Sequence, residues 1–176
     1  MLRIIALYGT IAGLIVGVPM VVTMVLTTGE IPHSYIIGYT TMLVALSAVF
    51  VAIKRHRDID LGGVIGFWPA LGLGLGISVV AGIFYVLAWE LSLAVTHMDF
   101  VASYAQMLIA QEKAKGASAA AIAKVTADMQ QLKVEYANPL YRLPMTFIEI
   151  FPVGVLVSVV SAGLLCNRRF LPARRN

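Results

Sequence analysis

Six side chains that can bind a metal ion or a proton collect near the ends of apolar stretches. They are Glu30, His33, Glu90, His97, Asp99 and Glu149. Imidazole and carboxylate groups suit Zn²⁺ and similar divalent ions. Glu90 and His97 would share a helix face but lie about 10 Å apart along its axis. They can share a metal only if Glu149 or His33 completes the site, and the chain has no compact motif such as H-E-x-x-H.

A second chemistry for these carboxylates is proton or ion transport, because pumps and transporters use carboxylates inside the membrane. Glu90 lies in the apolar stretch "IFYVLAWELSLAVTHMDF" (83–100), and Glu149 lies in "TFIEIFPVG". Both map to one interface, and the chain shows no clear inverted repeat of the transporter kind. A third interpretation is structural, with one carboxylate bonded to the backbone or to a basic partner such as Arg142.

Enzymatic chemistry on a lipid is a further alternative, which would need a nucleophile or base with a partner. The serines of the apolar stretches are Ser47, Ser78, Ser158 and Ser161. Serines in such segments ordinarily make hydrogen bonds between helices. His56, in "KRHRD", has no obvious catalytic partner. We therefore expect no enzymatic activity and no cofactor, and the sequence leaves the presence of a metal open.

The composition is that of an integral membrane protein. Of the 176 residues, 60% are hydrophobic and 12% are charged, against about 45–50% and 25% in soluble domains. The single Cys166 excludes an internal disulfide framework. The net charge of +4 is explained by basic residues beside apolar runs, so no nucleic-acid partner is expected.

Four apolar runs are long enough to cross a bilayer, at about 4–26, 35–53, 64–95 and 146–166. The predicted fold class is therefore all-α: a polytopic membrane protein, with residues 1–176 forming one membrane domain. Trp68 and Trp89 are 21 residues apart, which corresponds to about 32 Å of helix. Because Trp favours both membrane interfaces, this spacing places Glu90 at the outer interface.

The positions of Lys and Arg predict the orientation. Arg3, "KRHRD" and "RRFLPARR" all fall on one side of a four-span protein. Short flanks rich in Lys and Arg remain cytoplasmic. Both termini are therefore predicted to be cytoplasmic in a bacterial inner membrane. The expected partners are the lipid bilayer and anionic headgroups at the cytoplasmic face.

Residues 99–143 are predicted to form an extracytoplasmic helical hairpin between the third and fourth spans. Asp99 and Ser118 suit helix N-caps, and Gly116 suits the end of the first helix. Apolar residues line one face of the second helix: Ile122, Val125, Met129, Leu132 and Tyr136. A matching stripe starts at Phe100, so the two helices are expected to pack on each other, on the membrane surface or on a partner.

Glycines at small-xxx-small spacing predict close helix packing. They are Gly9, Gly13 and Gly17 in the first span and Gly72 and Gly76 in the third. Packing within the chain is the simpler interpretation, and a homodimer or other membrane-protein interface is the alternative.

The motifs of several segments resemble a known family. They are "IGYTTMLVALSAVFVAIKRHRD", "GGVIGFWPALGLGLGI", "MDF" and "FIEIFPVGVLVSVVSA". They are similar to the bacterial membrane-protein family catalogued as domain of unknown function 4199. The resemblance covers nearly the whole chain and implies a small four-span inner-membrane protein. It implies no activity and no catalytic residues.

These observations favour a non-enzymatic membrane scaffold or accessory subunit of an envelope complex. Such a protein would pack through its glycine stripes and contact a partner through the hairpin. The alternatives are a small ion- or proton-coupled transporter, or a metal-binding membrane protein, that uses Glu90 and Glu149 at the outer face.

Overall fold

The computed structural model describes residues 1–27 and 35–173, and in them the chain forms six α-helices and no strand. The helices are α1 (Leu2–Leu26), α2 (Tyr35–Arg55), α3 (Phe67–Thr96), α4 (Phe100–Ala114), α5 (Ala119–Tyr136) and α6 (Pro139–Leu165). A one-turn π-helical segment, η1 (His56–Asp60), continues α2. The predicted all-α class is confirmed.

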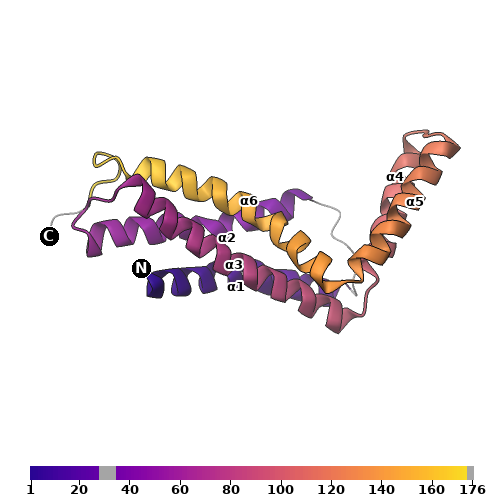
Figure 1. Ribbon diagram of the computed structural model, residues 1–176, viewed down its shortest axis with the longest axis horizontal. Coiled ribbons are helices and arrows are strands. Elements are labelled where there is room, and N and C mark those ends of the chain that lie inside the picture. The colour runs from indigo at the N-terminus through magenta and orange to yellow at the C-terminus, as the bar shows by residue number, and fades with distance from the viewer. Residues whose placement is uncertain (28–34, 174–176) are drawn as a thin grey trace.

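Four of these helices, α1, α2, α3 and α6, run alongside one another as an elongated bundle (Figure 1). Each is long and apolar enough to cross a membrane. Large apolar side chains such as Leu2, Ile36 and Leu156 are exposed on the outside of this bundle. Such a surface is suited to lipid, because lipid, unlike water, imposes no cost on exposed hydrocarbon.

The α4–α5 hairpin is at the opposite end of the bundle from the start of α1 and the end of α6, and it stands off at a steep angle to the bundle (Figure 1). The predicted caps position both of its helices. The Asp99 side chain accepts a hydrogen bond from the backbone N–H of Ala102, and Ser118 accepts one from Ala121. The hairpin between the third and fourth spans is confirmed.

The fourth span begins earlier than the sequence analysis expected, at Pro139 rather than near residue 146. Asn138 caps it by accepting a hydrogen bond from the N–H of Leu140, and proline is favoured in a first helical turn. Pro144 and Pro152 lie within the helix. Arg142 therefore belongs to α6, and not to the hairpin.

Glycines bring α1 and α3 into close contact. A Cβ added to Gly9 would lie 2.5 Å from Val80 Cβ, and one on Gly17 would lie 2.9 Å from Ala88 Cβ. Gly13 faces Phe84 in the same way, and Gly76 of α3 faces Ile5 of α1. These glycines thus pack within the chain, as the simpler interpretation expected.

Gly72 does not share this role, because a Cβ there would meet nothing within 4 Å. The α3–α6 crossing uses other small residues. A Cβ on Gly74 would lie 2.8 Å from Ser158, and one on Gly154 would lie 2.6 Å from the Ser78 Cβ. The two serine hydroxyls are 3.3 Å apart, and each donates to the carbonyl four residues earlier. Ser78 and Ser158 are therefore packing residues.

Candidate functional site

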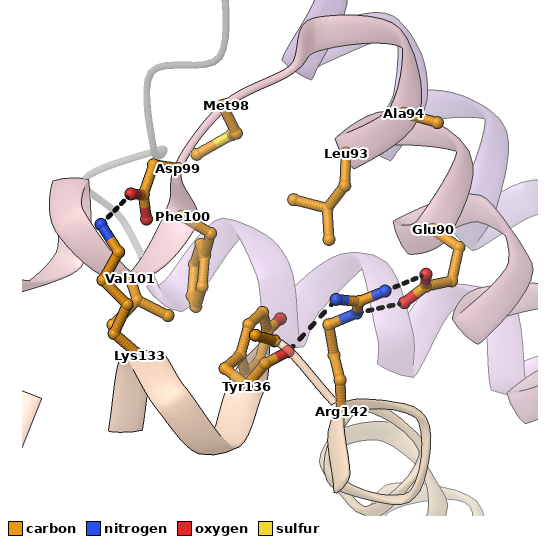
Figure 2. A pocket seen from close by; sticks show the side chains of 11 residues that line it. Glu90, Leu93, Ala94, Met98, Asp99, Phe100, Val101, Lys133, Tyr136 and Arg142 are labelled. Carbon is orange, nitrogen blue, oxygen red and sulfur yellow. Dashed lines mark hydrogen bonds and ion pairs between the residues drawn. The ribbon is translucent and has the colours of Figure 1, made fainter. Parts of the chain in front are cut away.

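An open groove of about 420 Å³ lies where the hairpin joins the bundle. We call it the hairpin groove. Its polar and aromatic lining consists of Glu90, Asp99, Phe100, Lys133, Tyr136 and Arg142. Figure 2 shows one ion pair on each side of the groove and the aromatic rings between them. Helices α3, α4, α5 and α6 all contribute residues, so the groove exists only in the folded chain.

Arg142 and Glu90 form the ion pair on the bundle side. Arg142 Nε and Nη2 each donate to one Glu90 carboxylate oxygen at 2.6 Å, while Nη1 donates to the backbone carbonyl of Tyr136 at 3.1 Å (Figure 2). Such a two-bond pair is stronger and more directional than a single contact. Arg142 is thus the basic partner of Glu90, and not of Glu149.

Two aromatic rings, Phe100 and Tyr136, line the groove, and the buried ring of Trp89 contacts both of them. Trp89 Nε1 donates to the hydroxyl of Tyr136 at 2.7 Å. The ring of Phe100 stands edge-on to Trp89, with the centroids 5.0 Å apart, and lies 5.5 Å from the ring of Tyr136. Burial raises the pKa of the Tyr136 phenol above its ordinary value. Tyr136 therefore stays a neutral hydroxyl that joins the end of the hairpin to α3.

Asp99 and Lys133 form the ion pair on the hairpin side, between the start of α4 and the last turn of α5. The hydrogen bond from Lys133 lowers the pKa of Asp99, and the N–H of Ala102 acts in the same direction. Asp99 therefore has two structural roles, as a helix cap and as an ion-pair partner.

Glu149 lies apart from the groove's ion pairs. The hydroxyl of Tyr85 on α3 donates to its Oε2 at 3.1 Å. Glu90 is joined to Arg142, which precedes Glu149 by seven residues, about 10 Å along α6. Glu149 therefore lies farther from the hairpin along the bundle axis than Glu90, and the two carboxylates do not form one site.

The remaining candidates do not complete a metal site in the part of the chain that the structure describes. His97 adopts a left-handed conformation, with φ of 52°, where α3 ends, and it is exposed. Glu30 and His33 lie outside the described residues. Across the ranges 1–27 and 35–173, no three His, Cys, Asp or Glu side chains are placed to hold a metal ion.

A second polar centre, which was not expected from the sequence, lies at the end of the bundle where α1 begins and α6 ends. Arg57, interpreted only as an orientation signal, is fully buried in η1. Its Nη1 donates to the carbonyls of Leu165 and Phe170, its Nη2 to that of Leu171, and its Nε to Asp58. No sequence pattern singled out this centre, because the π-helical turn that places Arg57 in it is seen only in the structure.

The fold and these centres define the class of the molecule, a polytopic membrane protein with four candidate spans and a helical hairpin between the third and fourth. The chain belongs to the family described as protein of unknown function (DUF4199), whose model matches residues 7–167. The resemblance that the motifs suggested is thereby confirmed. A search of curated proteins and a search of solved structures each gave no match.

Proposed function

We propose that this protein is a non-enzymatic scaffold or accessory subunit of an envelope complex in the bacterial inner membrane. Its four spans hold the α4–α5 hairpin in a fixed orientation on the extracytoplasmic side, where another membrane protein binds it. The main support is the way the hairpin is attached. Trp89 of α3 donates to the hydroxyl of Tyr136, and Arg142 of α6, which is paired with Glu90, donates to the Tyr136 carbonyl, so the end of α5 is bonded to both α3 and α6.

The exposed face of α5 is evidence for a protein partner. Ala120, Ala123, Ala127 and Val134 are spaced so that they lie on one face of the helix, and all four are exposed. Val134 is 76% exposed, although it is a large apolar residue. Small side chains next to an exposed apolar one suit close approach by a second helix. Lys124 and Asp128, also exposed, give this side of the hairpin the polar character of a protein contact in water.

The charges of the hairpin groove also favour a structural role. Glu90, Asp99, Lys133 and Arg142 are all used in pairs within the chain. Groups committed in this way hold elements together. A catalytic acid or base, in contrast, needs a proton that a substrate can reach.

The end of the bundle that holds the termini is proposed to contact anionic headgroups of the cytoplasmic leaflet. Exposed Arg3, Arg55, Arg168 and Arg169 support this contact. Arg57 does not take part, because it is buried and bonded within the chain.

Site-specific photocrosslinking in intact cells tests the proposed function. A photoreactive residue at Ala123 should give a discrete adduct with one membrane protein, whereas one at lipid-facing Leu87 should give only lipid adducts. Ala127→Glu should abolish the adduct at position 123. Gln106→Glu makes the same change of charge at an exposed position of α4, and it should leave the adduct at position 123 intact.

Two results would contradict the scaffold. One is the absence of any discrete protein adduct at position 123 when the folded protein is present at normal abundance. The other is ion flux through proteoliposomes that contain only this chain, which would favour the transporter alternative.

A further inference from the structure

Glu149 occupies a position that the proposed scaffold does not explain. It lies about 10 Å beyond Arg142 along α6, and Tyr85 lies about 7 Å before Glu90 along α3. These two helices run in opposite directions, so both distances lead from the hairpin groove toward the middle of the bundle (Figure 1). The Glu149–Tyr85 hydrogen bond is therefore inside the membrane-crossing part of the protein.

In the part of the chain that the structure describes, no basic side chain forms an ion pair with Glu149. Glu149 is exposed at the surface of the bundle, next to Ile148, which is 65% exposed. At this depth such a surface faces hydrocarbon. An ionised carboxylate there costs several kcal/mol, and that cost is removed when the group takes up a proton.

Hydroxyl groups lead from the hairpin groove toward this carboxylate. Tyr136 lines the groove, and its hydroxyl accepts a hydrogen bond from Trp89, which lies one helical turn after Tyr85 on α3. The Tyr85 hydroxyl bonds Glu149 directly. The titratable groups around this pair lie on four helices: Tyr39 of α2, which acts on Tyr85, Tyr85 itself on α3, Tyr136 of α5 and, two turns away on α6, Arg142 with its partner Glu90.

We propose that Glu149 is a proton-binding site within the membrane, hydrogen-bonded to Tyr85 and reached from the hairpin groove past the hydroxyl of Tyr136. A proton from water in the groove adds to Oε1 and gives the neutral acid, while Oε2 continues to accept from the Tyr85 hydroxyl. No other bond changes. This site does not depend on the proposed scaffold function.

Reaction with dicyclohexylcarbodiimide tests the proposal. This apolar reagent partitions into membranes and adds to a protonated carboxyl group, which keeps it as a stable N-acylurea. The full-length protein in liposomes is treated with it, digested and mapped by mass spectrometry. We expect one modified residue, Glu149, and a yield that falls as the pH is raised.

Two variants serve as controls. Glu149→Gln should lose the modification, and Glu90→Gln should keep it, since Glu90 bonds Arg142 and is not part of the Glu149–Tyr85 pair. Tyr85→Phe removes only the hydroxyl and should move the pH at which half of Glu149 reacts. If this pH is the same in Tyr85→Phe as in the unchanged protein, Tyr85 is not part of the site.

Three outcomes would overturn the proton site in a protein whose thermal unfolding shows it to be folded. The first is an unmodified Glu149 at every pH. The second is modification of Glu90 to the same extent as Glu149. The third is protection of Glu149 by sodium or potassium at fixed pH, which would make the site one for a monovalent cation.

Discussion

Arg142 joins three elements through one side chain, because its guanidinium reaches Glu90 on α3 and the carbonyl of Tyr136 on α5 while Arg142 itself belongs to α6. Lysine has neither the planar fork nor the number of donors needed for these bonds. The side chains of Arg142 and Glu90 are 18% and 28% exposed, so water screens the pair only in part.

Loss of this pair should destabilise the protein measurably. We expect Arg142→Ala to cost about 2 kcal/mol and Arg142→Lys about 1 kcal/mol, in the range of charge-assisted hydrogen bonds at partly buried sites. Thermal unfolding in detergent checks this. In the double variant Arg142→Ala/Glu90→Ala, the two effects should be less than additive. Full additivity would contradict a direct coupling between the two residues.

Substitution of Arg57 should destabilise the protein at least as much as substitution of Arg142. Arg57→Met removes donors from three backbone carbonyls and an ion-pair partner from Asp58, in a site that is fully buried. Leaving such groups unsatisfied costs about 1–3 kcal/mol for each uncharged group that finds no new partner. We expect a lower unfolding temperature and faster proteolysis after Leu165. Arg55→Met, at the exposed neighbouring position, is the matched control.

Some features of the helices could be predicted from local sequence, and others could not. Four spans and the Asp99 and Ser118 caps could be predicted, because hydropathy and capping depend on neighbours in sequence. The start of α6 at Pro139 was missed, since the apolar run itself begins later. The hairpin groove could not be predicted either, because it requires residues 90–101 and 133–142 to meet in space.

The α1–α3 contact should tolerate no side chain at its glycines. Gly9→Ala would place a Cβ 2.5 Å from Val80, and such overpacking typically costs about 1–3 kcal/mol. Gly72→Ala is the control, because its Cβ would meet nothing within 4 Å and alanine favours the helix by up to about 1 kcal/mol. Gly9→Ala should lower the unfolding temperature, and Gly72→Ala should leave it unchanged or raise it. Equal shifts of the unfolding temperature in the two variants would contradict this packing.

The hairpin should depend on pH through Asp99. Its pKa is lowered in the folded chain, so the ion pair stabilises the fold above the pKa of the unfolded chain, and this contribution is lost as pH falls through the folded value. Because the pair is exposed, its contribution is at most about 1 kcal/mol. Hydrogen exchange of α4 amides should show Asp99→Asn weakening the hairpin at pH 7 and weakening it less at pH 3. Asp99→Ala, which also removes the cap, should weaken it at both.

The bundle places both chain termini at one end and the hairpin at the other, and the side of the membrane that each end faces is open to direct labelling (Figure 1). The native Cys166, exposed at the end of α6, marks the end with the termini. With Cys166 replaced by Ala, a cysteine at Ala123 marks the hairpin.

We expect a membrane-impermeant maleimide to label Ala123→Cys in intact spheroplasts. It should label Cys166 of the natural sequence only after permeabilisation. The reverse pattern would invert the orientation that the basic flanks predict.

Helix α3 runs from Phe67 to Thr96 without a proline beyond its first turn, and its two ends contact different parts of the protein. At 30 residues it is about 45 Å long, against a hydrocarbon core of about 30 Å. An untilted α3 would therefore extend about 15 Å beyond the hydrocarbon. Trp89, which bonds the end of α5, lies on the same uninterrupted helix that packs against the glycines of α1. One continuous helix thus links the attachment of the hairpin to the α1–α3 contact.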